Sequence, residues 1–308
     1  MALKTASRGK GKVAGETAHA DGALYVVATP IGNLEDITLR ALRVLGEVDL
    51  ILAEDTRVSA RLLQRFAITT PLKAFHEHNE EKVAPWVVER LDEGMDIALI
   101  SDAGTPLLRD PGFHLIRLLH ARNKKVVPVP GPSALVCALS VAGMPMERFI
   151  FEGFLPVKQE ARRRRLEALR EEARTLVLYE APHRVRAAIG DMGDVLGPER
   201  HAVIARELTK TFETIREGPL SGLYQWLGED ENNQRGEFVL VIEGKTKGER
   251  KDDAAVTEEG ARVLRLLMEE LPLKKAVTLA ARLTGQKRNR LYRAALQHDG
   301  SLVTGDEQ

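Results

Sequence analysis

The chain has 308 residues, of which 45 are basic and 45 acidic, and 44% of its residues are hydrophobic. A length above the usual range of one domain, about 100 to 200 residues, predicts two compact domains and a smaller appendage. The zero net charge excludes a field over the whole surface that would attract nucleic acid, so any polyanion site must be local. No apolar run approaches the length of about 18 residues that crosses a bilayer, which excludes a membrane-spanning helix.

The N-terminal segment bears on the location of the protein, and the single cysteine bears on disulfide formation. Residues 1–21 contain no apolar core of the signal-peptide type, so we expect a disordered tail and a cytoplasmic protein. Cys137 is the only cysteine, which makes an intramolecular disulfide impossible. Its apolar neighbours predict a small buried side chain.

The first half of the chain alternates short β-branched runs with helical spacing, which is typical of a parallel α/β sheet. One helical pattern has its apparent start at Asp36 and includes Leu45, and another covers residues 113–119. The predicted strands are 24–28, 49–53, 72–75, 97–100 and 125–129.

The pattern restarts after Pro145, and the second half mixes hairpin-like and helical spacing. Its predicted strands are 148–154, 175–179, 202–205, 212–216 and 238–243. Two helical segments follow, 258–270 and 273–298, with Pro272 where the second begins and a break near Gly285. We therefore predict an N-terminal α/β domain over 22–144, a second α+β domain over 145–245, a linker over 246–257 and a helical appendage over 258–300.

Three loops that follow predicted strands are rich in glycine and proline: 29–34, 101–106 and 130–133, the last with Ser133 as a candidate helix N-cap. Ligands of an open parallel sheet bind at the carboxyl ends of its strands, and Gly and Pro let the backbone approach a ligand or lock a turn. Each loop alone could be an ordinary tight turn. Three together predict a pocket for a polar small molecule, although none matches the common nucleotide-binding glycine motifs.

Seven ordered motifs resemble the bacterial 16S ribosomal RNA cytidine-2'-O-methyltransferases, a branch of the tetrapyrrole-methylase superfamily. The similarity covers about residues 24–245 and extends toward the helical tail. The motifs are TPIGNL (29–34), EDTR (54–57), SDAGTP (101–106), PGPS (130–133), EGFLP (152–156), YEAPHR (179–184) and ARELTK (205–210).

The resemblance implies a tetrapyrrole-methylase-like two-domain α/β fold, with a parallel α/β N-domain, a mixed-sheet α+β second domain and a small helical C-terminal appendage. It also implies S-adenosyl-L-methionine as cofactor, small-subunit ribosomal RNA as partner, and a homodimer. Two departures from the tetrapyrrole methylases favour the RNA branch: Ala28, Thr29 and Pro30 replace a glycine-rich first loop, and Thr105 replaces an aspartate. The cofactor-binding positions that it implies are Pro30, Gly32, Ser101, Asp102, Gly104, Thr105, Pro106, Ser133, Tyr179, Glu180, Ala205, Glu207, Gly236 and Glu237.

Methyl transfer to a ribose hydroxyl needs alignment of oxygen, carbon and sulfur, and a base that accepts the hydroxyl proton. Asp102, Glu180 and Glu207 are candidates for the base, and Lys210 is a candidate for orienting phosphate or stabilising an alkoxide. A salt bridge or helix cap is the structural alternative for each carboxylate, and the sequence does not choose among them. We predict no required metal and interpret His76–His78 as a solvated turn.

Two local basic segments bear on whether the substrate is as large as a nucleic acid. Residues 274–293 contain seven basic residues and no acidic one, and residues 157–170 contain six basic and two acidic residues. These segments suit phosphate contacts, with Tyr292 available for stacking, or they are two solvated helix faces. The predicted RNA-binding residues are Arg57, Arg163, Arg164, Lys274, Lys275, Lys287, Arg288 and Arg290. The two terminal helical segments weakly resemble a helix-turn-helix module.

Two alternative functions stay open at this point. One is methylation of a tetrapyrrole intermediate, against which the basic tail and the altered first loop count. The other is a non-catalytic RNA-binding protein of ribosome assembly, against which the intact Gly/Pro loops count.

Overall fold

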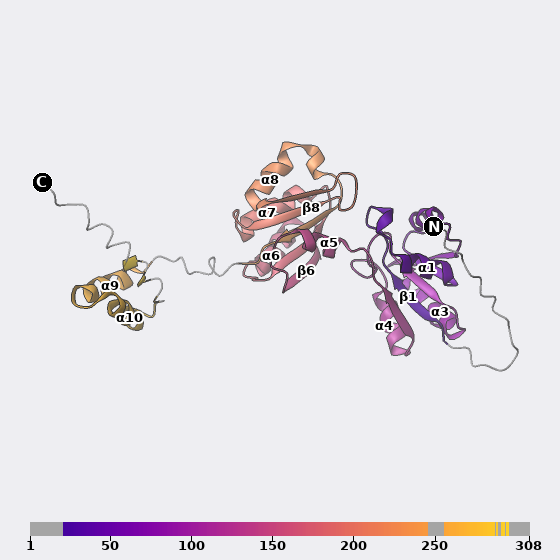
Figure 1. The fold of residues 1–308 in the computed structure, drawn as a ribbon, viewed down its shortest axis with the longest axis horizontal. Coiled ribbons are helices and arrows are strands. Elements are labelled where there is room, and N and C mark those ends of the chain that lie inside the picture. Colours follow the sequence, from indigo (N-terminus) through magenta and orange to yellow (C-terminus); the bar gives the residue numbers. More distant parts are fainter. Residues whose placement is uncertain (1–20, 246–255, 287, 289–290, 293, 296–308) are drawn as a thin grey trace, which may run out of the picture. The chain divides into compact units, whose positions relative to one another are not determined.

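The computed structural model describes residues 21–245, 256–286, 288, 291–292 and 294–295. The described residues up to Leu169, together with Thr175–Ile242, form one compact unit (Figure 1). Arg170–Arg174 and the described residues from Glu243 onward form a second unit. Residues 1–20 of the predicted N-terminal tail, Lys287 and Arg290 lie outside the described residues, and the predicted domain boundaries stay predictions. Among the described helices, none is both long enough and apolar enough to cross a membrane.

The first sheet of the larger unit is wholly parallel, as predicted, and its strands lie in the order β3-β2-β4-β1-β5. Its strands are β1 (Ala23–Val27), β2 (Leu50–Ala53), β3 (Leu72–Ala74), β4 (Ile97–Ile100) and β5 (Lys125–Val129). Its helices are α1 (Leu39–Glu47), α2 (Thr56–Arg65), α3 (Glu80–Asp92) and α4 (Phe113–Ala121).

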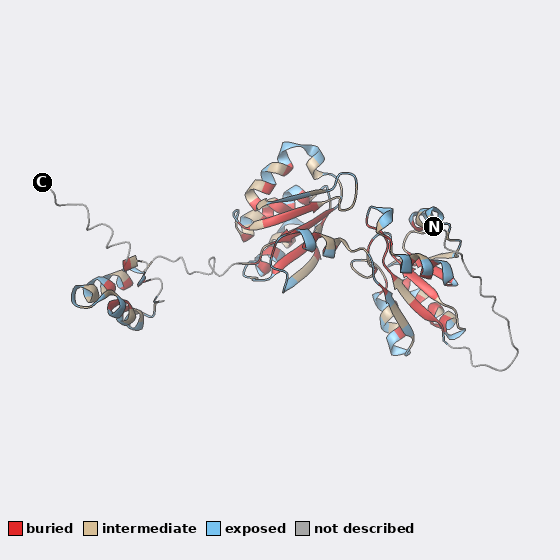
Figure 2. Cartoon of the chain, viewed as in Figure 1, coloured by how far each residue is buried: buried red, intermediate tan, exposed pale blue. Residues whose placement is uncertain are grey.

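Helices on both faces of this sheet explain why β4 is continuously apolar. Ile97 and Leu99 pack with side chains of α3 and α4, whereas Ala98 and Ile100 pack with side chains of α1 and α2. Successive side chains of a strand point to opposite faces, so a strand covered on both sides buries every residue. Figure 2 shows the central strands β2 and β4 of this sheet coloured as buried, with more exposed helices around them.

The predicted helix start at Asp36 is wrong. Asp36 ends a short 3-10 helix, Leu34–Asp36, and the backbone at Ile37 is extended. Helix α1 begins at Leu39 because the Thr38 hydroxyl accepts a hydrogen bond from the Ala41 amide at 3.0 Å and caps the first turn.

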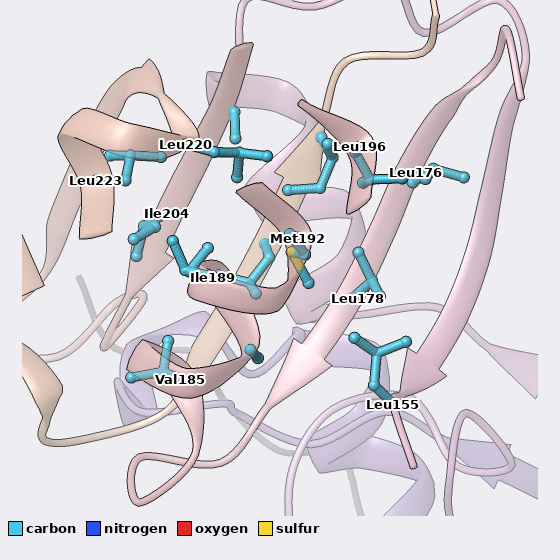
Figure 3. Packing of buried hydrophobic residues seen from close by; sticks show 14 of the residues in the cluster. Leu155, Leu176, Leu178, Val185, Ile189, Met192, Leu196, Ile204, Leu220 and Leu223 are labelled. Atoms are coloured by element: carbon cyan, nitrogen blue, oxygen red, sulfur yellow. The ribbon is translucent and has the colours of Figure 1, made fainter. Parts of the chain in front are cut away.

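The second sheet is mixed, in the order β6-β7-β10-β8-β9: β6 and β7 are parallel and the remaining neighbours antiparallel. Its strands are β6 (Phe149–Phe154), β7 (Thr175–Glu180), β8 (His201–Arg206), β9 (Thr214–Pro219) and β10 (Phe238–Ile242). Helices α6 (Gln159–Leu169), α7 (Val185–Leu196) and α8 (Leu220–Glu229) share one core with it, in which Val185, Ile189 and Met192 of α7 lie near strand residues (Figure 3).

The opposite face of the second sheet packs against α5 (Ala134–Val141), through Val177, Val203 and Val239. Two predictions in this region need correction. Strand β9 begins at Thr214 rather than at Phe212, whose side chain is 71% exposed in the preceding turn. Cys137 on α5 is only partly buried, because α5 turns Leu135, Ala138 and Leu139 toward the sheet instead.

The smaller unit contains α9 (Glu258–Glu270) and α10 (Leu273–Thr284), which pack around Leu264, Val277 and Ala280. Pro272 occupies the N-cap of α10, and Gly285 ends it in the left-handed conformation at φ +67°. Glycine adopts this conformation without a Cβ clash, so the predicted break at Gly285 is confirmed.

Candidate active site

The three Gly/Pro loops meet because their strands are neighbours. Strands β4, β1 and β5 lie side by side and are parallel, so the loops that follow them leave the same edge of the sheet. Thr29 and Gly104 exchange backbone hydrogen bonds of 2.9 and 3.0 Å, which ties the first loop to the second. The Thr105 hydroxyl donates to the Pro132 carbonyl at 3.0 Å and ties the second loop to the third.

One edge of the second sheet forms the wall of the site opposite these loops. Strands β7 and β8 both run antiparallel to β10, so their carboxyl ends lie beside its amino end. Tyr179, Ala205 and Glu237 come from these three places. The Asn33 amide donates to the Thr209 hydroxyl at 3.1 Å and thereby joins the first loop to this edge.

A cavity of about 410 Å³ lies between these loops and the edge of the second sheet. This volume falls within the usual range of small-molecule sites, about 300 to 1,000 Å³. The predicted residues that line it are Gly104, Thr105, Ser133, Tyr179, Glu180, Ala205 and Glu237. The predicted residues outside its lining are Pro30, Gly32, Ser101, Asp102, Pro106, Glu207, Lys210 and Gly236.

Sequence reasoning missed a group of lining residues on the long loop after β4, namely Leu108, Arg109 and Asp110. Non-glycine residues with positive φ shape this loop, Leu107 at 72° and Arg109 at 80°, and Gly112 follows at 128°. Such backbone conformations depend on tertiary contacts and leave little trace in a residue pattern. The Asp110-Pro111-Gly112 triplet was the available signal, since it delays the start of α4 until Phe113.

The cavity fits the cofactor that the resemblance implies. The Ser133 hydroxyl oxygen is buried at the N-terminus of α5 and has no hydrogen-bond partner among the described residues, so it is free to bind a polar group. Phe154 and Tyr179, whose rings stand edge to face with centroids 5.8 Å apart, present aromatic surface. Aromatic faces attract a cation, and S-adenosylmethionine carries a sulfonium and an ammonium group.

Two of the predicted catalytic carboxylates are held by basic side chains. The buried Glu180 carboxylate accepts hydrogen bonds from the Arg184 guanidinium and, at 2.8 Å, from the Ala181 amide. Glu207 accepts from Lys210 at 2.9 Å and from the Glu237 amide at 2.9 Å. Burial raises the pKa of Glu207, but these two hydrogen bonds and the charges of Lys210 and Arg206 together outweigh burial and hold the pKa below its ordinary value.

Three other carboxylates gather where β2 and β4 end. Burial raises the pKa of Asp110 to about 6; a hydrogen bond from the Ser101 hydroxyl opposes this effect, and the charge of Asp102 adds to it. Burial likewise raises the pKa of Glu54, and the charges of Asp110 and Asp102 raise it further. The exposed Asp102 accepts from the Asp55 amide at 3.0 Å. Within the part of the chain that the structure describes, no set of three side chains is placed to hold a metal ion.

The predicted RNA-binding residues divide into paired and unpaired groups. Arg163 pairs with Asp191 and Asp194, Arg164 with Glu160, and Arg57 with Asp55, which leaves less of their charge for phosphate. Lys274, Lys275 and Arg288 are exposed and have no carboxylate partner among the described residues of the smaller unit.

Comparison with family models finds two matches along the chain. Residues 23–224 match the family described as Tetrapyrrole (Corrin/Porphyrin) Methylases, and residues 254–299 match the RsmI C-terminal HTH domain. The fold is similar to two solved structures, each covering 72% of this chain and 94% of its own. One is a uroporphyrin-III-C-methyltransferase from Thermus thermophilus (22% identity, TM-score 0.51) and the other a cobalt precorrin-4 methyltransferase (18% identity, TM-score 0.54).

Curated relatives are similar over nearly their whole length. A protein of Pseudomonas aeruginosa named Ribosomal RNA small subunit methyltransferase I is 58% identical over 91% of this chain and 98% of its own. Proteins of the same name from Haemophilus influenzae and Escherichia coli O157:H7 are each 51% identical, over 90% and 92% of this chain and 97% of their own lengths. The chain therefore belongs to the tetrapyrrole (corrin/porphyrin) methylase family, in the group of the small subunit methyltransferases I, and it is a methyltransferase that uses S-adenosylmethionine.

Proposed function

We propose that the protein transfers a methyl group from S-adenosylmethionine to the ribose 2'-hydroxyl of a cytidine in small-subunit ribosomal RNA. The observation that carries this proposal is the joining of a methylase cavity to a helical unit whose exposed lysines lack acidic partners among the described residues. The relatives named for small-subunit ribosomal RNA span both parts, because their similarity covers about nine-tenths of this chain. Cytidine and the 2'-oxygen rest on the resemblance of the seven sequence motifs.

The cofactor, when bound, supplies a methyl group that its positive sulfur has already activated for displacement. The protein then has to orient the reactants, and orientation can contribute about 7 to 11 kcal/mol. The Thr29–Gly104 bridge and the Thr105–Pro132 hydrogen bond hold the loops rigid, and the Ser133 hydroxyl, unpartnered among the described residues, would bind a polar group of the cofactor. Leu108, Phe154 and Val239 give the lining an apolar surface against which the reactants would pack.

The first turn of α10 favours RNA as the larger substrate. Lys274 and Lys275 lie at the positive end of the helix dipole, where a basic side chain weakens a helix. Helix stability therefore does not explain their position, whereas contact with phosphate does. By contrast, α9 begins with Glu258 and Glu259, as the dipole favours.

A transfer assay tests the proposal. The protein is incubated with labelled cofactor and small ribosomal subunits that lack the modification, and digestion to nucleosides identifies the product. We expect label in 2'-O-methylcytidine. Label on a base would overturn the assignment of the 2'-oxygen. Label on a porphyrinoid precursor and none on the subunit would replace this function with the alternative enzyme activity.

The binding-protein alternative and the remaining predictions need separate measurements. Calorimetry with S-adenosylmethionine should show binding to an apo preparation, and no binding would favour a non-catalytic assembly factor. The predicted homodimer is tested by light scattering in solution. The predicted cytoplasmic location is tested by cell fractionation.

A further inference from the structure

The carboxylates that line the cavity differ in what already binds them. Glu180 is buried against Arg184, and Glu237, whose side chain is 75% exposed, pairs with Lys210 at 3.2 Å. Asp110 lines the same cavity, and no basic side chain of the described residues lies within 4.0 Å of its carboxylate. Of these three lining carboxylates, Asp110 is the one whose negative charge no basic side chain neutralises.

The backbone around Asp110 is held in an unusual shape. Arg109 has φ +80°, and its guanidinium donates to the carbonyl oxygens of Glu152 at 2.9 Å and Phe154 at 3.5 Å. Both acceptors belong to β6 of the second sheet, so this contact ties the loop after β4 to the opposite wall of the cavity. A strained loop that is anchored in this way holds the neighbouring carboxylate in place, as a reactive group requires.

We infer that Asp110 is the general base of the transfer, an inference that rests on the proposed function. The ribose hydroxyl oxygen forms a bond to the methyl carbon, the carbon–sulfur bond breaks, and its electron pair returns to the sulfur. The hydroxyl proton passes to a carboxylate oxygen of Asp110 and from there to solvent.

The surroundings of Asp110 adapt it to this role. Its pKa of about 6 leaves the carboxylate ionised near neutral pH but more basic than an ordinary aspartate, and efficient bases have a pKa near the working pH. The groups that act on its charge are acidic or neutral: Asp102 and Glu54 at the strand ends, the Ser101 hydroxyl, and Tyr179 across the cavity. The neighbouring Arg109 also lines the cavity, but its guanidinium donates to carbonyl oxygens of β6. Burial and the charge of Asp102 both favour its protonated form.

The test is the pH dependence of transfer by the full chain. Wild-type kcat/KM for the ribosomal subunit should fall as pH drops through about 6. Asp110→Asn should lower kcat roughly a hundredfold or more and lose this limb of the profile, with the calorimetric affinity for S-adenosylmethionine unchanged. Asp110→Glu should restore part of the rate. Glu89→Gln is the matched control, because Glu89 is exposed on α3 and outside the cavity lining.

The outcomes separate this inference from the proposed function. If wild type methylates the subunit and Asp110→Asn keeps kcat within about twofold with the same pH limb, the inference is overturned and the proposed function stands. If Asp110→Asn melts no lower than wild type but loses cofactor affinity, Asp110 binds the cofactor and is not the base. If wild type methylates no RNA, the proposed function and this inference fail together.

Discussion

Gly153 shows how one residue maintains the contact across the cavity. Its φ is +67°, and a Cβ atom there would lie 1.9 Å from the Arg109 Nε. Gly143 has nearly the same φ, +63°, but a Cβ there would meet no atom within 4 Å. The two glycines therefore separate backbone strain from the loss of the Arg109 contact.

We expect Gly153→Ala to be more destabilising than Gly143→Ala. The left-handed conformation alone costs about 1 to 2 kcal/mol for alanine, and displacing the exposed Arg109 guanidinium from its carbonyl acceptors adds about 0.5 to 1.5 kcal/mol. Urea unfolding measures both variants, and calorimetry with the cofactor should show weaker binding only for Gly153→Ala. Equal destabilisation of the two variants would show that the Arg109 contact contributes nothing.

The raised pKa of Asp110 also leads to a prediction about the stability of the protein. Its pKa is about 6 in the folded protein against an ordinary 3.8, so between these pH values the folded state binds the proton more tightly than the unfolded state. Stability therefore falls as pH rises through this window and stays lower above it. Asp110→Asn should melt at a higher temperature than wild type at pH 7, and the difference should vanish below about pH 4. Equal melting temperatures at pH 7 would argue against a half-buried, uncompensated carboxylate.

The arginines of α6 show that a basic run in the sequence can consist of paired side chains in the structure. The run Arg162–Arg165 is a basic segment by composition, but Arg162 and Asp191 form an ion pair whose side chains are only 6% and 3% exposed. Arg163 and Arg164 also have carboxylate partners, and Arg165 pairs with Glu152. Much of this run holds α6 to α7 and β6, whatever phosphate contacts Arg163 and Arg164 make.

Asp191→Asn should destabilise the protein by about 3 to 5 kcal/mol, because it leaves the buried Arg162 without its counter-charge. Arg164→Gln is the comparison, since Arg164 and Glu160 are 75% and 87% exposed and such pairs contribute about 0 to 1 kcal/mol. Denaturant unfolding gives both values. A difference below about 1 kcal/mol between the variants would contradict a structural role for the Arg162–Asp191 pair.

The lysines of helix α10 lead to a prediction about RNA binding. Replacing Lys274 and Lys275 together by glutamine should weaken RNA binding and reduce the slope of log affinity against log salt by roughly 1.5. The same change removes two positive charges from the helix N-terminus, so the melting temperature should stay equal or rise. Arg262→Gln on α9, whose side chain pairs with Glu259, is the control that should leave the salt slope unchanged. An unchanged slope in the double variant would remove α10 from the RNA interface.

The whole molecule contains two compact units with separate cores. The residues that line the cavity all belong to the larger unit. Truncation after Lys251 should therefore weaken RNA binding and leave cofactor affinity nearly intact, as calorimetry and a filter-binding assay can measure in parallel. An equal loss of cofactor binding would show that the smaller unit completes the cavity.

Much of this architecture was predictable from local pattern. The runs at 97–100 and 125–129 coincide with β4 and β5, and the expected pocket at the ends of the strands is confirmed by the convergence of the three loops. The seven motifs pointed to the methylase family, which the comparisons confirm. Strand and helix periodicity and turn chemistry are properties of neighbouring residues, so a sequence displays them directly.

The choice of reactive side chains depended on contacts between distant residues. Asp110 and Glu180 are both acids close to strand ends, and only the folded chain places Arg184 against one of them while leaving the other without a basic partner among the described residues. The same holds for Arg162, whose charge is neutralised by a residue 29 positions away. A group's charge and basicity depend on burial and on neighbours in space. The sequence by itself therefore determined the elements, the loops and the family, whereas the tertiary structure decided which carboxylate stays available for chemistry.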